Sequence, residues 1–235
     1  MVRSLNSIAY SLVELFRANF RNTDSVDIRL FKNFVQQTRA QIIKQRLDSG
    51  GYIDDALVQD LGIVTFIPID SSSISSIPSD KYMMRSIVKL PPTINRKNNI
   101  GTFTRIGSAD GLERKFNLVP RERALISGNG RFNNNDIYVF QDSGYLYLIS
   151  KSNLHKYITK VNVRGIFVNP EDAYTFNTAI SSVTPWSDDL EYPSSESVLS
   201  DIENIILSTK FKFLQVQVDD KLSNGSDETT VTRLK

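Results

Sequence analysis

Apolar residues recur at helical spacing in the N-terminal part of the chain. The stripes within residues 4–20 and 24–49 each repeat every three or four positions, which is the pattern of an amphipathic helix. Ser4 is placed to cap the first helix, and cations of the second segment, such as Arg39, fall largely on other faces. Because the connection between the stripes is short, we predict an antiparallel helical pair that contributes to the core.

The middle of the chain changes to the shorter period of β-strands. Two aromatic runs flank Gln141-Asp142-Ser143-Gly144, which predicts a hairpin, and Gly165 is expected to mark a bulge. The predicted strands lie at residues 63–69, 84–90, 102–106, 137–140 and 145–149 and within residues 157–167.

Shorter signals predict the connecting elements. We expect a short helix at residues 52–61 that ends at Gly62, and a helical or irregular segment at residues 119–125. Asn169-Pro170-Glu171-Asp172 is expected to start a turn, and a third helix is expected to begin at Ser194 or Ser195.

The expected fold class is α+β. An N-terminal antiparallel helical pair, a central antiparallel β-rich body and a C-terminal helix with a flexible tail make up the chain. The alternation at residues 211–218 leaves a strand open there as well. The expected parts, which together form one structural domain, are the helical region 1–62, the β-rich body 63–170, the acidic loop and C-terminal helix 171–218, and the mobile tail 219–235.

Composition limits the chemistry of the chain. It has 235 residues, a formal net charge of +2 and no cysteine, so disulfides and thiolate chemistry are excluded. No run approaches the roughly 20 apolar residues that span a bilayer. The N-terminus lacks the apolar segment of a signal peptide, so we expect a soluble chain that makes no membrane contact.

The near-neutral charge hides a polarised distribution. Residues 81–131 are strongly basic, whereas residues 171–203 contain acids and no lysine or arginine. This asymmetry is typical of a solvated surface, of a partner that is a polyanion, or of head-to-tail contact between copies. The basic candidates for contact with DNA or with another subunit are Arg96, Lys97, Arg105, Arg114, Lys115, Arg121 and Arg123.

Motifs for catalysis, metals and cofactors are weak. His155 is the only histidine and lies in a polar connector, so no multi-histidine metal site can form. Asp110 precedes a glycine and is interpreted as turn chemistry, and Gly128-Asn129-Gly130 lacks the lysine of a phosphate loop. We therefore predict no catalytic, metal-binding or cofactor-binding residue. Trp186 is either pinned on its own domain or inserted into a neighbour.

A succession of short motifs resembles a family of virion proteins. The motifs are RAQIIKQ at residues 39–45, YIDDALVQDLG at 52–62, KLP at 89–91, IGSADG at 106–111, YLYLI at 145–149 and GIFVNP at 165–170. In order and spacing they resemble the head-to-tail connector or ring proteins of crAss-like tailed bacteriophages over most of residues 4–210.

The resemblance implies a non-enzymatic structural protein. It implies a homo-oligomeric ring of roughly 12 copies, by analogy with portal symmetry, in the neck or tail of the virion. The expected partners are the portal, other tail or neck ring proteins and passing DNA, and synthesis is expected in the cytoplasm of the host bacterium. Alternative interpretations are another tail or head-completion protein, or a non-specific DNA-binding protein of the infected cell.

Overall fold

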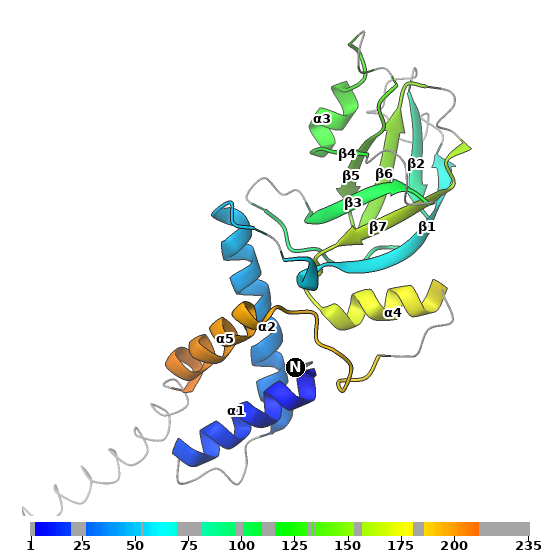
Figure 1. Ribbon diagram of the computed structural model, residues 1–235. Coiled ribbons are helices and arrows are strands. Elements are labelled where there is room, and N and C mark those ends of the chain that lie inside the picture. The colour runs from blue at the N-terminus through cyan, green and yellow to red at the C-terminus, as the bar shows by residue number, and fades with distance from the viewer. Residues whose placement is uncertain are drawn as a thin grey trace, which may run out of the picture. The chain divides into compact units, whose positions relative to one another are not determined.

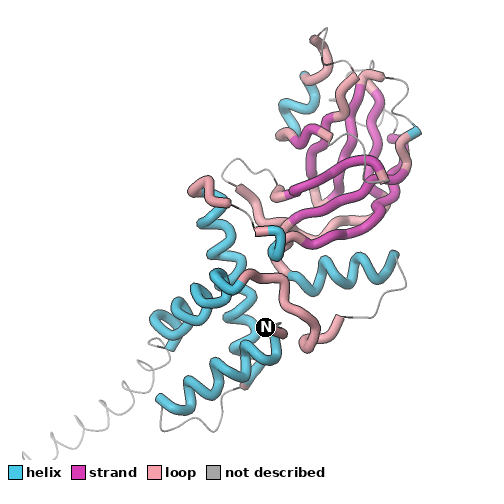
Figure 2. Tube along the Cα trace, viewed as in Figure 1, coloured by secondary structure: helices cyan, strands magenta, loops and turns pink. Residues whose placement is uncertain are grey.

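The computed structural model describes residues 3–19, 27–52, 54–69, 81–96, 101–109, 116–130, 133, 135–152, 157–180 and 186–211. The chain divides into two compact units. Unit 1 comprises Met1–Ile42 with Asp188–Lys235, and unit 2 comprises Ile43–Ser187. Helices and a mostly antiparallel sheet confirm the α+β class, and the described strands all fall in unit 2 (Figures 1 and 2). The four-part division of the chain stays a prediction.

Unit 1 is built from helices. Its elements are α1 (Leu5–Asn19), the first part of α2 (Ile28–Asp48) and α5 (Glu196–Ile205), which continues into a π-helical turn at Ile206–Lys210. Phe16 of α1, Phe31 of α2 and Phe211 meet edge-on or tilted, with ring centroids 5.0–5.9 Å apart. These contacts confirm the predicted helical pair and the predicted C-terminal helix as parts of one core.

Local hydrogen bonds fix where the first two helices begin. The Ser7 N–H donates to Ser4 Oγ, and the Ser4 N–H donates to Ser7 Oγ, both at 3.1 Å. In α2, Asp27 Oδ1 accepts from the Arg29 N–H at 2.9 Å. Each side chain satisfies an N–H group that the first helical turn leaves without a partner, so the cap predicted at Ser4 is confirmed.

Unit 2 contains a seven-stranded sheet in the order β3-β7-β1-β2-β6-β5-β4. All pairings are antiparallel except that of β4 with β5. The long β1 pairs with β7 through its first part and with β2 through its last part. The strands are β1 (Gln59–Ile69), β2 (Tyr82–Ser86), β3 (Phe103–Ser108), β4 (Asn117–Leu118), β5 (Tyr138–Asp142), β6 (Tyr145–Ser150) and β7 (Lys160–Gly165).

The two faces of this sheet bury different cores. One face contributes Val64, Phe66, Val139 and other residues to the larger core, which Ala173 of α4 (Pro170–Ile180) joins. Phe140 belongs to a smaller core on the other face, where α3 (Arg121–Ile126) packs. Adjacent residues of one strand thus serve opposite cores, which explains the unbroken apolar runs that the hairpin strands show in the sequence.

The predicted hairpin is confirmed in β5 and β6. Asp142 pairs with Tyr145, so Ser143 and Gly144 alone form the turn, with φ values of 51° and 83°. A two-residue turn with positive φ at both positions matches the twist of the strands, and glycine adopts this conformation without steric cost.

The bulge expected at Gly165 lies in the strands beside it. The register shifts between Asp60 and Gly62 of β1, and between Phe103 and Arg105 of β3, each time next to the end of β7. A Cβ atom on Gly165 would lie 2.9 Å from the carbonyl oxygen of Thr102. Glycine is therefore needed there for the close approach of a neighbouring backbone rather than for an extra residue of its own strand.

The predicted helix at residues 52–61 is mostly wrong. Only Asp55–Leu57 forms a 3₁₀ turn, which Asp54 caps by accepting from the Ala56 N–H at 3.1 Å. Gln59 and the residues after it pair with β7 instead. Hydrogen bonds to β7, which lies about one hundred residues further along the chain, override the local helical pattern.

Two further boundaries differ from the prediction. The strand expected at residues 84–90 runs from Tyr82 to Ser86, because Ser86 Oγ donates to the Val88 carbonyl and accepts from the Leu146 N–H, which ends the ladder. The turn expected at residues 169–172 is the start of α4, with Pro170 as its first residue and two acids in its first turn.

Some of the remaining predictions are confirmed, and others concern residues outside the described ranges. The helical alternative for residues 119–125 is confirmed as α3. Trp186 lies edge-on against Tyr174 of α4 with ring centroids 5.5 Å apart, so it packs on its own unit. Asp110, His155, most of residues 211–218 and the tail after them lie outside the described residues.

Candidate interaction surfaces

Four of the seven basic candidates lie in the described part of unit 2, and the structure does not bring them to one place. Lys97, Arg114 and Lys115 lie outside the described residues. Arg96 and Arg123 line one pocket of about 730 Å³. Arg105 and Arg121 lie on β3 and α3, and neither lines this pocket.

The pocket lies where the two ends of the sheet approach each other. Phe103 of the edge strand β3 and Asn117 of the edge strand β4 both line it. The N–H of Phe116 donates to the carbonyl of Ile106 in β3 at 2.8 Å, and this bond links the two ends. Arg96 and Arg123 are exposed at the pocket, and neither forms an ion pair with a residue that the structure describes. Both guanidinium groups are therefore available for an anionic partner.

Tyr138 and Asp136 give the pocket a second polar wall. The Tyr138 hydroxyl donates to Asp136 Oδ2 at 3.4 Å. Burial, together with the charge of Asp136, raises the pKa of Tyr138, while the charge of Arg123 acts in the opposite direction. The phenol is therefore neutral at physiological pH and serves as a hydrogen-bond donor within the pocket.

A buried lysine fixes the helix that carries Arg121 and Arg123. Lys81 is 4% exposed, and its Nζ donates to the carbonyls of Leu125 at 2.5 Å and Ser127 at 2.6 Å. These carbonyls belong to the C-terminal end of α3, where the helix dipole favours a cation. The lysine replaces the hydrogen bonds that the helix itself cannot supply and holds α3 on the sheet.

Arg121 has a partner within unit 2. Its Nη1 lies 2.7 Å from Oδ2 of Asp142 at the end of β5, and both side chains are partly exposed. Ion pairs of this kind contribute roughly 0.2–1 kcal/mol. Arg121 therefore joins α3 to the hairpin and is less available to a partner than Arg96 or Arg123.

Arg105 belongs to a second basic surface that the sequence did not reveal as a unit. Strand register places Arg105 opposite Arg164, Arg164 opposite Asp60, and Lys160 opposite Thr65. The residues between them along β1, β3 and β7 point to the larger core, so these side chains share the other face. We call this surface the outer sheet face; its residues are Asp60, Ile63, Thr65, Ile67, Arg85, Ile87, Arg105, Lys160 and Arg164.

Aromatic rings border the outer sheet face on the side of β6. Arg85, which pairs with Ile67 and Tyr147, holds its guanidinium 4.7 Å from the ring centre of Tyr145. The Nζ of Lys89 lies 5.6 Å from the centre of the same ring. The attraction between a cation and a ring face restrains both side chains beside β6.

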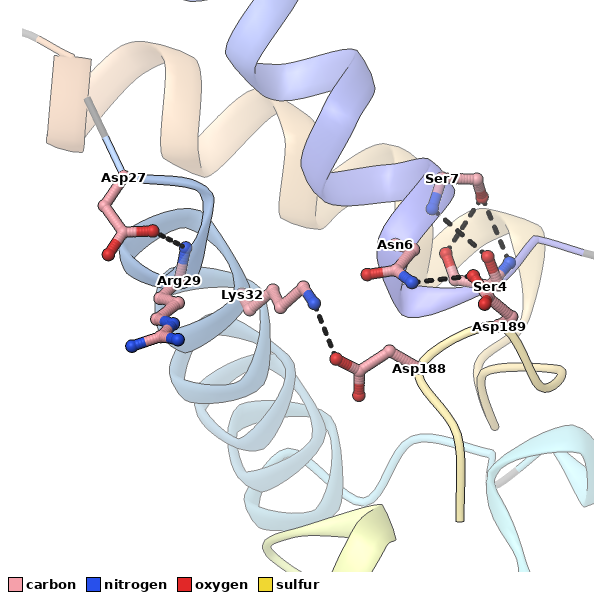
Figure 3. A network of polar contacts seen from close by, with 8 residues as sticks. All are labelled: Ser4, Asn6, Ser7, Asp27, Arg29, Lys32, Asp188 and Asp189. Carbon is pink, nitrogen blue, oxygen red and sulfur yellow. Dashed lines mark hydrogen bonds and ion pairs between the residues drawn. The ribbon is translucent and has the colours of Figure 1, made fainter. Parts of the chain in front are cut away.

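Several described acidic residues of unit 1 form contacts within that unit. Figure 3 shows Asp188 and Asp189 reaching the N-terminal helices, where Lys32 Nζ donates to Asp188 Oδ2 and Asn6 Nδ2 donates to Asp189 Oδ1, both at 2.6 Å. Arg3 forms an ion pair with Glu203 of α5 at 2.7 Å. Part of the acidic segment thus holds the three helices of its own unit together.

The prediction that Arg39 lies on a face of its helix away from the buried stripe is wrong. It is fully buried in unit 1, its Nε donates to the Pro193 carbonyl at 3.0 Å, and its guanidinium lies 5.7 Å from the ring centre of Tyr192. Burial lowers the pKa of Arg39 and raises the pKa of Tyr192 to about 12, which the charge of Arg39 partly opposes. The cation and the phenol both act as structural groups here.

The described ranges contain neither a cluster of metal-binding side chains nor a helix suited to span a membrane. Among these residues no group of three or more histidine, cysteine, aspartate or glutamate side chains is placed to hold a metal ion. No helix within them is both long and apolar enough to cross a bilayer. The features that stand out in these ranges are the pocket with Arg96 and Arg123 and the outer sheet face.

Such surfaces on an α+β scaffold define the class of the protein as an interaction or assembly module. The sequence match is more specific, since residues 8–229 match the phage tail ring protein 2 family of crAss-like phages. The match covers most of the chain, so the chain belongs to this family, and the resemblance drawn from its motifs is confirmed. No curated protein matches the chain. The family makes the chain a structural component of the virion tail.

Proposed function

We propose that the chain is a non-enzymatic subunit of a homo-oligomeric ring in the head-to-tail connector, below the portal through which the phage DNA passes. The match to tail ring proteins over residues 8–229 carries this proposal. A ring of identical subunits needs two different surfaces that meet head to tail and close. By analogy with portal symmetry, the ring contains roughly 12 copies.

The basic residues are the proposed contacts with DNA or with a neighbouring ring protein. Arg96 and Arg123 support a phosphate contact best, because both are exposed at one polar pocket. A guanidinium that neutralises a phosphate releases counterions and binds without reading the base sequence. Lys97, Arg114 and Lys115 remain candidates by sequence, and Arg105 and Arg121 are candidates for contact with a subunit.

Reconstruction of the intact phage particle by cryo-electron microscopy tests the proposed position. The expected result is density for this chain as a closed ring between the capsid portal and the tail, with its symmetry giving the copy number. Density elsewhere in the tail or on the head would replace the connector proposal with that of another tail or head-completion protein. Absence of the chain from the particle would contradict the whole proposal.

A non-specific DNA-binding protein of the infected cell is the second candidate function, and the basic pocket favours it. Its test is the binding of the purified chain to duplex DNA at several salt concentrations. Binding through phosphates would weaken steeply as salt rises, in proportion to the number of phosphates neutralised. An Arg96→Glu/Arg123→Glu variant would then lose most of this binding, whereas a chain that binds no DNA at low salt excludes this function.

A further inference from the structure

We propose that the outer sheet face of unit 2 binds a second copy of this chain, through the exposed acids at the start of the copy's α4. The inference rests on the proposed ring function and specifies which surfaces join its subunits. Three observations carry it: the apolar centre of the face, its cationic border, and the position of two acids on the other side of the same unit.

The centre of the outer sheet face is apolar and exposed. Ile63 and Ile67 of β1 are each 39% exposed, and Ile87 is 49% exposed. The Ile87 N–H donates to the Thr65 carbonyl at 3.0 Å, which places Ile87 beside β1. Branched apolar side chains at the centre of a surface are typical of the core of a protein–protein interface. They would gain little from phosphate groups, so a protein partner is favoured over DNA here.

Cations surround this apolar centre. Arg105, Lys160 and Arg164 lie on the side of β3 and β7, and Arg85 lies on the side of β6. Asp60 is the one acid in the defined face, and its Oδ2 is 3.5 Å from Nε of Arg164, with both side chains more than two fifths exposed. This single carboxylate leaves an excess of positive charge, which selects a partner with an acidic surface.

The same unit carries suitable acids on its opposite side. Glu171 and Asp172 are exposed in the first turn of α4, and neither forms an ion pair with a described residue. Ala173 of α4 packs in the larger core with Val64, on the face of β1 that is opposite to Ile63 and Ile67. Two complementary surfaces on opposite sides of one compact unit suit the heterologous, head-to-tail contact that generates a ring.

Charge reversal of the cationic border tests the inference. The purified full-length chain is compared with Lys160→Glu/Arg164→Glu by sedimentation velocity over a range of concentrations. We expect the wild-type chain to assemble and the variant to need at least about tenfold higher concentration, because like charges then face the acids. Arg29→Glu/Lys44→Glu is the matched control, since it makes the same charge change at two exposed positions of α2 and should assemble like the wild type.

Two further variants keep the result interpretable. Ile87→Ser changes no charge and should also weaken assembly, with an unchanged unfolding midpoint. Adding Glu171→Lys/Asp172→Lys to the Lys160→Glu/Arg164→Glu chain should restore assembly, because both surfaces then have exchanged their signs. Restoration supports the pairing of these two surfaces.

Three outcomes would overturn the inference. The wild-type chain could stay monomeric, the Lys160→Glu/Arg164→Glu chain could assemble like the wild type, or the chain with all four substitutions could fail to recover assembly. Failure of the proposed function gives a different result from these assembly outcomes, because the reconstructed particle would then contain no ring of this chain. If the particle contains the ring but the Lys160→Glu/Arg164→Glu chain assembles like the wild type, the ring proposal stands. Only the assignment of the outer sheet face as its interface is then wrong.

Discussion

The two units of this chain place their charged residues in opposite circumstances. In unit 1 Lys32 and Arg3 contact acids of the segment that follows unit 2, and Arg39 is enclosed completely. In unit 2 Lys160 and Arg164 of the outer sheet face are exposed, as are Arg96 and Arg123 of the pocket, while Arg85 and Arg105 are partly buried. One long contact, between Arg164 and Asp60, is the ion pair within the described residues of that face. These three cations of unit 1 therefore serve the fold, whereas the exposed cations on these surfaces of unit 2 remain available for binding.

This difference changes the meaning of the charge asymmetry seen in the sequence. A basic segment and an acidic segment far apart in one chain suggest contact between copies. The structure shows that some acids, such as Asp188 and Glu203, are already engaged by the chain's own N-terminal residues. Acids outside these contacts, such as Glu171 and Asp172, remain candidates for a neighbouring copy.

Truncation of Arg39 is expected to have the largest effect on stability. Arg39→Ala removes a fully buried side chain, leaves a cavity and removes the donor to the Pro193 carbonyl, so we expect a loss of about 3 kcal/mol. The measurement is the free energy of unfolding in urea. Arg164→Ala on the exposed outer sheet face is the control and should change this energy by less than about 0.5 kcal/mol. Equal losses in the two variants would contradict the contrast between the units.

High pH should expose the role of the buried phenol beside Arg39. Because folding raises the pKa of Tyr192 to about 12, the neutral phenol stabilises the fold fully below the unfolded pKa of about 10, and this contribution is lost as pH rises through the folded pKa. The loss is on the order of 2–3 kcal/mol, since the pKa differs by about two units and each unit corresponds to about 1.4 kcal/mol.

The measurement for Tyr192 is the difference in unfolding free energy between the wild type and Tyr192→Phe from pH 9 to 12. The Phe variant cannot ionise at this position and should lose less stability over the interval. Tyr52→Phe is the matched control, because it makes the same substitution at a side chain that is 85% exposed. Parallel profiles for the wild type and Tyr192→Phe would contradict a buried neutral phenol.

Lys81 is an exception within unit 2, because its charge serves the fold, and its removal should have the next largest effect. Lys81→Met leaves the carbonyls of Leu125 and Ser127 without their charged donor, which is expected to cost about 2 kcal/mol. Hydrogen exchange should become faster in α3 and remain unchanged in the hairpin of β5 and β6. Faster exchange across the whole sheet would show that Lys81 supports more than this helix.

Elements with local determinants could be predicted from the sequence. The hairpin followed from Gln141-Asp142-Ser143-Gly144 between two β-branched and aromatic runs, although Gln141 and Asp142 extend the first strand. Helix α1 followed from its apolar stripe and the cap at Ser4. The start of α4 was missed although its information is local. Asn169-Pro170 was interpreted as a turn, but proline at the first position followed by two acids is equally a helix start.

Features that depend on distant pairing could not be predicted. The start of β1 is set by its register with β7, and the same register unites Arg105 with Lys160 and Arg164. The sequence therefore identified Arg105 as a candidate but not the surface to which it belongs. The burial of Arg39 likewise depends on Pro193, which lies 154 residues further along the chain.

Breaking the ion pair of Lys32 with Asp188 should have the smallest effect on the free energy of unfolding. It tests most directly whether the acids of unit 1 stabilise that unit. Both side chains are partly exposed, at 21% and 32%, so a double-mutant cycle of Lys32→Ala and Asp188→Ala should give a coupling energy of about 0.5–1 kcal/mol. The coupling should fall as salt is raised, because charges near the surface are screened. The pair of Arg17 with Glu14 on α1, whose side chains are 52% and 70% exposed, should give less coupling in the same measurement. A Lys32–Asp188 coupling no larger than that of Arg17–Glu14 would mean that this ion pair contributes little to the stability of unit 1.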